Sequence, residues 1–128
     1  MNAVTLKFFE LALDAERIDS TCLEQSSEPA LELVLSHVLA HPESRVELAD
    51  AFIQIAHSHG LGPPELIQYC MHALRWEEVK QHFSDWLAVE GSERVRHYLR
   101  NLLMSFDDNW YHASMYARFG GAGSNGSG

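Results

Sequence analysis

The stretch Pro29-Ala-Leu-Glu-Leu-Val-Leu-Ser-His37 decides the fold, because it matches Pro64-Glu-Leu-Ile-Gln-Tyr-Cys-Met-His72 without gaps at an offset of 35 residues. Across positions 29–52 the two copies share six identical residues. A period near 35 is typical of proteins built from stacked pairs of helices. The recurring residues are mostly apolar positions and helix starts, so the repeat predicts architecture. Function must be sought in the residues that do not recur.

Apolar side chains at helical spacing continue on both sides of this match. Ser27 is a favourable N-cap, Pro42 ends one helix, and Gly62-Pro63-Pro64 separates the two copies. Arg75-Trp76 marks a tight turn or kink. We therefore expect an all-α fold of six or seven helices in antiparallel pairs. The expected helices lie at 3–15, from 27 to Pro42, 43–59, from Pro64 to Arg75, 76–90 and 92–106, with a last short helix after Asp107.

Composition indicates one ordered domain. Apolar residues make up 46% of the 128 residues and charged residues 21%, a balance typical of globular proteins. We expect a single helical domain over residues 1–119. Residues 120–128 contain mostly glycine and serine and are expected to be a flexible tail, either native or left from expression.

The chain is acidic, with a net charge of −9. Residues 1–64 hold ten acidic and three basic residues, whereas residues 65–128 hold eight and six. This charge opposes nucleic-acid binding, which depends on Lys and Arg. It favours encounter with a basic protein. Solubility alone is the competing explanation, because many cytosolic proteins are acidic.

Some of these acids follow a pattern that suggests a docking surface. Two pairs, Glu28 with Glu32 and Glu43 with Glu47, place like charges four residues apart, which costs a few tenths of a kcal/mol in helix stability. An electrostatic interface would benefit from such crowding, although an ordinary solvated face also tolerates it. A second acidic pair precedes a tryptophan near the C-terminus, where a helix cap and a core tryptophan form the alternative. The candidate partner-binding residues are Glu28, Glu32, Glu43, Glu47, Asp50, Asp107, Asp108 and Trp110.

No motif for catalysis, phosphate binding or a cofactor is present. His37 and His41 have the spacing of two zinc ligands on one helix, but Val38 occupies the position where a metalloprotease has its glutamate. We expect the histidines to be structural, with no bound metal or cofactor and no catalytic residue. A metal-dependent enzyme that uses clustered histidines, His57 and His59 among them, remains the alternative.

The cysteines and the N-terminus indicate a cytoplasmic protein. Cys22 and Cys70 form neither a CxxC motif nor a disulfide framework, which favours a reducing compartment. The N-terminal residues lack the basic and apolar regions of a signal peptide. No apolar run is long enough to cross a bilayer, so we expect no membrane association.

The paired helices, the period of 35 and the prolines that open successive units resemble HEAT-like α-solenoids over residues 27–118. This resemblance implies a short solenoid, with an irregular bundle as the alternative. The segments Leu74-Arg75-Trp76-Glu77-Glu78-Val79 and Phe106-Asp107-Asp108-Asn109-Trp110 are similar to small bacterial toxin-immunity proteins. That second resemblance implies a noncatalytic antitoxin that blocks a basic toxin through an acidic helical face.

The oligomeric state stays open at this point, between a monomer and a small homo-oligomer. A homo-oligomeric scaffold or adaptor is the alternative to an immunity protein, and it would use Trp110, Tyr111 and Tyr116 as interface aromatics. Aromatic side chains are well suited to that role because they bury a large area at low cost in conformational entropy.

Overall fold

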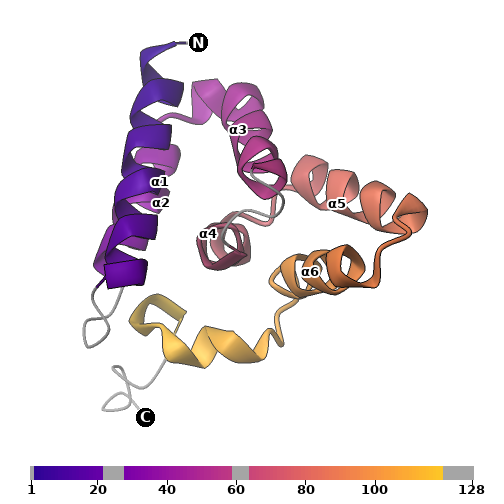
Figure 1. Ribbon diagram of the computed structural model, residues 1–128. Helices are drawn as coiled ribbons and strands as arrows, with labels where there is room; N and C mark the ends of the chain where they lie inside the picture. The colour runs from indigo at the N-terminus through magenta and orange to yellow at the C-terminus, as the bar shows by residue number, and fades with distance from the viewer. Residues whose placement is uncertain (1, 22–27, 59–63, 120–128) are drawn as a thin grey trace.

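The computed structural model describes residues 2–21, 28–58 and 64–119 (Figure 1). These residues form helices and turns without a strand, which confirms the all-α prediction. Ser27, Gly62, Pro63 and the tail at 120–128 lie outside the described residues. The α-helices of the described part are α1 (Ala3–Thr21), α2 (Glu28–Leu39), α3 (Arg45–His57), α4 (Pro64–Leu74), α5 (Glu77–Val89) and α6 (Glu93–Met104). Three short 3-10 segments are η1 (Pro42–Ser44), η2 (Tyr111–Met115) and η3 (Ala117–Phe119).

The helix boundaries follow local chemistry. Pro42 opens η1 after α2 has ended, as a proline that cannot continue the preceding helix should. Arg75 has a φ of 53°, which allows the chain to reverse between α4 and α5 within two residues. Ser92 caps α6, because its hydroxyl accepts a hydrogen bond from the Val95 N–H at 3.4 Å. The predicted breaks at these three places are confirmed.

Helix α4 is the centre of the molecule, seen end-on in Figure 1. It packs against α1, α2, α3 and α6. Two hairpins flank it, because α1 packs most extensively on α2, and α5 on α6. The match of positions 29–52 with 64–87 predicts that α2 pairs with α3 and α4 with α5, so the helix pairs in closest contact differ from the pairs that the repeat predicts.

The core joins all of these helices through large apolar side chains. Phe8, Phe52 and Tyr69 are completely buried, and they come from α1, α3 and α4 respectively. The rings of Phe8 and Phe52 pack edge to face with their centroids 4.8 Å apart. The rings of Phe52 and Trp76 pack in the same way, with a centroid distance of 6.0 Å. Each large apolar side chain buried in this way contributes about 1.5–3 kcal/mol to stability. These aromatic contacts therefore hold α3, and the residue that precedes α5, against α1.

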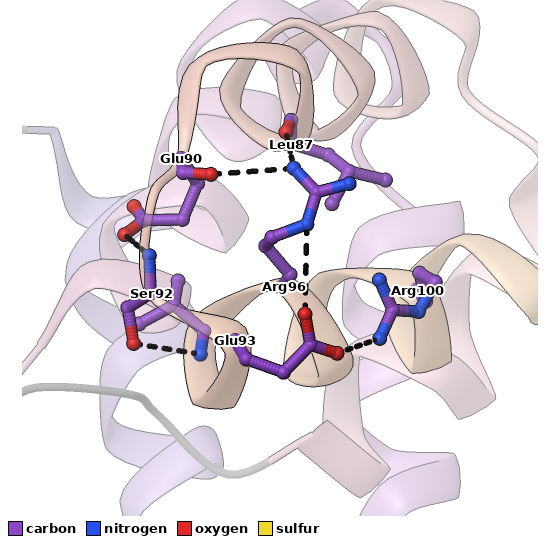
Figure 2. A network of polar contacts seen from close by, with 7 residues as sticks. Leu87, Glu90, Ser92, Glu93, Arg96 and Arg100 are labelled. Carbon is purple, nitrogen blue, oxygen red and sulfur yellow. Dashed lines mark hydrogen bonds and ion pairs between the residues drawn. The ribbon is translucent and has the colours of Figure 1, made fainter.

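A polar network fixes the turn between α5 and α6 (Figure 2). Arg96 reaches back from α6 and donates to the carbonyl oxygens of Leu87 and Glu90, at 2.8 and 3.2 Å. These two carbonyls lie at the C-terminal end of α5, where a cation satisfies acceptors that the helix leaves unpaired. Glu93 forms ion pairs with Arg96 and Arg100. Arg96 and Arg100 of α6 are thus used inside this hairpin.

Among the described residues, five pairs in side-chain hydrogen bonds are 33 positions apart. They are His37 with the carbonyl of Val4, Arg45 with Glu78, Gln68 with the carbonyl of Asn101, His72 with the carbonyl of Ser105, and Arg75 with Asp108. The first joins α2 to α1, the second joins α3 to α5, and the others join α4 and the residue after it to α6 and the turn that follows it. His37 and His72 occupy equivalent positions in the repeat but contact residues on opposite sides of them in the chain, so the sequence repeat does not carry over into one repeated set of contacts.

Candidate functional site

Three acidic side chains line the outer side of η1 and α3. Glu43, Glu47 and Asp50 are exposed, and their spacing of four and then three residues places them on one helical face. Because η1 continues directly into α3, Glu43 lies one turn before Glu47. Among the described residues none of the three has a Lys or Arg partner, and Asp50 accepts a hydrogen bond from Gln54 at 3.0 Å. We call these residues the α3 acidic surface.

The arginine of α3 does not neutralise this surface. Arg45 donates two hydrogen bonds to the carboxylate of Glu78, at 2.7 and 2.9 Å, and lies over the ring of Trp76 at 4.9 Å. These hydrogen bonds hold the pKa of Glu78 below its usual value. Arg45 is thereby committed to α5, and the negative potential of Glu43, Glu47 and Asp50 remains uncompensated.

Glu28 and Glu32 form a different structure, which we call the C-terminal clamp. The carboxylate of Glu28 accepts hydrogen bonds from the backbone N–H groups of Ala117 and Arg118, at 2.9 and 3.0 Å. The Arg118 guanidinium donates to both oxygens of Glu32, at 2.8 and 2.9 Å. Tyr69 Oη lies 2.9 Å from both carboxylates and can donate its proton to either. These two acids bind the chain's own end, so the structure separates them from the α3 acidic surface.

The C-terminal clamp should open in acid. The hydrogen bond from Arg118 is the main reason that the pKa of Glu32 lies below the ordinary value of 4.5. A lowered folded-state pKa means that this stabilisation is present above pH 4.5 and is lost as the pH falls through the folded value. We expect NMR signals of Arg118 to report release of residues 117–119 in that range. The variant Glu32→Gln should lack the step, and an unchanged acid transition in it would contradict the assignment.

Of the two acids that follow α6, one forms an ion pair and the other faces solvent. Asp108 pairs with Arg75 at 2.8 Å, while Asp107 is exposed and accepts a weak hydrogen bond from the Asn109 N–H at 3.5 Å. Trp110 is only 4% exposed, so its ring packs inside the protein and is not presented to a partner. An open hollow lies beside this turn, lined by Arg75, Lys80, Leu103, Phe106, Asp107 and Asp108.

The predicted interface aromatics are likewise internal. Tyr116 is buried, and its hydroxyl donates a hydrogen bond to Glu65. Its ring lies 4.9 Å from that of Tyr69. The side chain of Tyr111 lies outside the described part of the structure. The burial of Trp110 and Tyr116 leaves neither ring available for contact with a second copy of the chain.

Three of the described histidines contact backbone carbonyl groups. His37 Nε2 lies 2.8 Å from the carbonyl oxygen of Val4, and His41 Nδ1 lies 2.9 Å from that of His37. His72, the repeat equivalent of His37, has its own carbonyl contact at 2.8 Å. His59 lies outside the described residues. Within the described residues no three side chains of His, Cys, Asp or Glu converge into a group that could hold a metal ion.

Cys70 has the environment of a core residue. It is completely buried, and burial raises the pKa of its thiol far above the usual value. A thiol held in its neutral form is a poor nucleophile. Cys22 lies outside the described residues.

Among the helices described, none combines the length and the apolar composition that spanning a bilayer requires.

One polar pair was missed by sequence analysis. His57 at the end of α3 and His82 in α5 bring their Nε2 atoms to 3.3 Å, and the ring of His57 stacks on that of Trp86 at 4.0 Å. The two histidines are 25 residues apart and occupy different positions in the repeat. Only the packing of α3 against α5 brings them together, so no local pattern could have revealed the pair.

Six of the seven acids predicted to bind a partner fall into two groups. Glu28, Glu32 and Asp108 hold internal contacts, whereas Glu43, Glu47 and Asp50 face solvent on one helix. An array of exposed carboxylates can attract and orient a cationic surface.

No family model matches this chain, and neither a curated protein nor a solved structure matches it.

Proposed function

We propose that the chain is a noncatalytic protein that binds a basic protein through the α3 acidic surface. The observation that carries the proposal is the contrast between the three acids on this one helical face and the acids that pair with an arginine. Glu32, Glu78 and Asp108 each form an ion pair with an arginine, but Glu43, Glu47 and Asp50 form none among the described residues. Like charges held along one helix cost stability, and a cationic partner would offset that cost.

The specific form that we propose is an immunity protein that neutralises a basic toxin in the cytoplasm. The two segments that resemble such proteins support it, because they are neighbours in the fold. Arg75 in the first segment pairs with Asp108 in the second, at 2.8 Å. Trp76 and Trp110 of these segments are buried, so they support the fold and leave recognition to the exposed acids. A toxin with a basic active-site cleft would be blocked by occlusion, which requires no chemistry from this chain.

The association rate with such a toxin tests the proposal. The partner to be used is a basic protein encoded beside this chain's gene, with rates measured by stopped flow at low and physiological salt. Replacing Glu43, Glu47 and Asp50 together by lysine should slow association by about tenfold or more at low salt and remove most of its salt dependence. The effect arises because steering charges act on the encounter before any contact forms.

A matched control separates the α3 acidic surface from net charge. Glu10, Asp14 and Glu16 are exposed on α1, and replacing these three by lysine changes the net charge by the same amount on another helix. This control should retain most of the association rate. Equal slowing in both triple variants would show that overall charge is responsible, and an unchanged rate in the α3 variant would remove that surface from consideration.

A further inference from the structure

The side chains of His57 and His82 are held edge to face by two packed helices. Their Nε2 atoms are 3.3 Å apart, with ring centroids separated by 5.5 Å and ring planes at 80°. The Arg45–Glu78 ion pair joins the starts of the same two helices, α3 and α5. Contacts near both ends of α3 thus fix its position beside α5, and the two imidazoles approach each other as a result of backbone packing.

The ring of His57 is also held in place by a tryptophan ring. It stacks on the indole of Trp86 at 4.0 Å with an interplanar angle of 7°. The indole N–H of Trp86 in turn donates to Glu90 Oε1 at 2.9 Å. The other carboxylate oxygen of Glu90 accepts from the Ser92 N–H in the turn between α5 and α6 (Figure 2). Outer contacts of this kind orient a ligand ring before a metal ion arrives.

The separation of the two nitrogens fits a tetrahedral metal ion. Two nitrogens bound to zinc at 2.0–2.1 Å with a tetrahedral angle lie about 3.3–3.4 Å apart, and the observed 3.3 Å matches this distance as well as that of a long hydrogen bond. We propose that His57 and His82 form a two-histidine site for a divalent transition metal, with Zn²⁺ as the ion that the geometry favours. This site is independent of the proposed binding function.

Protonation and access are also suited to a ligand pair. Partial burial, followed by the nearby ring of His82, lowers the pKa of His57 below 6.5. The neutral imidazole is the form that binds a metal ion. Its side chain is exposed at the end of α3, so an ion can reach it. No third protein ligand joins the pair among the described residues, which leaves the other coordination positions to water or to a carboxylate of a bound molecule.

Zinc binding to protein without a histidine tag tests this site. Titration calorimetry at about pH 7.5 should show one Zn²⁺ per chain, and binding should fall sharply at about pH 5.5, where protons compete for the nitrogens. His57→Gln and His82→Gln should each lower the affinity by at least about tenfold, the loss that even outer-contact substitutions bring at metal sites. His97→Gln is the matched control, because His97 is exposed on α6 and its Nε2 contacts Asn101.

Imidazole ¹⁵N signals give a readout that does not depend on the variants. In the wild-type protein, Zn²⁺ should shift the Nε2 resonances of His57 and His82 together and leave the other histidines unchanged. Zinc that binds at His37 and His41, or equal affinity in His57→Gln and His97→Gln, would overturn the assignment. A ring pair that keeps one Nε2–H donor at saturating Zn²⁺ would show a hydrogen-bonded pair in place of a metal site.

Discussion

Replacing Phe52 by alanine is expected to lower the free energy of unfolding by about 3–5 kcal/mol. Phe52 is completely buried and contacts Phe8 of α1 and Trp76 before α5 through ring edges. The variant would lose transfer energy and leave a cavity where three parts of the chain meet. Since single domains are stable by only about 5–15 kcal/mol, this loss should be plain in a urea titration as a large fall in the midpoint.

Val46 provides the control on the same helix. It is 78% exposed, so Val46→Ala should change the free energy of unfolding by less than about 0.5 kcal/mol. The difference between the two changes in the free energy of unfolding reports the burial of the side chain, because both variants place alanine in the same helix. A cost below about 1 kcal/mol for Phe52→Ala would show that α1, α3 and α5 do not meet at this ring.

Trp110→Ala is expected to have a comparable effect on stability, about 3–5 kcal/mol. The indole packs against the ring of His72 at 5.0 Å and stacks near Tyr116 at 6.1 Å, which holds the C-terminal segment on α4. If Trp110 instead anchored a partner, alanine would weaken binding and leave stability intact. Urea unfolding and partner affinity should therefore be measured on the same variant.

Trp110→Phe distinguishes shape from hydrogen bonding at this position. The indole N–H is buried without an acceptor among the described residues, so phenylalanine removes an unsatisfied donor as well as some apolar area. We expect this variant to lose clearly less stability than Trp110→Ala. An equal loss in both would indicate that the indole nitrogen has a partner that matters.

The helices themselves could be predicted from local sequence. Pro42, the Arg75-Trp76 break and the Ser92 cap act within a few residues, and the structure confirms all three. Two segments differ from expectation. Helix α1 runs to Thr21 and not to residue 15, and its Glu16 and Arg17 are strong helix formers that extend it beyond the apolar pattern. The residues after Asp107 form 3-10 turns in place of a helix, because their aromatic side chains lack helical spacing.

The candidate surface could be predicted only in part. Glu28 with Glu32 and Glu43 with Glu47 have the same spacing, yet the first pair binds the backbone and guanidinium of residues 117–118. That difference depends on a segment 86–90 residues away, and no local pattern records it. The same limit explains His57 and His82. Spacing shows which side chains share a helical face, but tertiary packing decides what that face meets.

The C-terminal clamp has a consequence for how distant parts of the chain depend on each other. Glu28 and Glu32 of α2 bind residues 117–118, and α2 is the helix on which α1 packs most extensively. The segment after α6 therefore returns past α4 to the first pair of helices (Figure 1). Release of this segment would remove contacts from α2 and from α4 at once, so the first and last described elements should unfold as one cooperative unit.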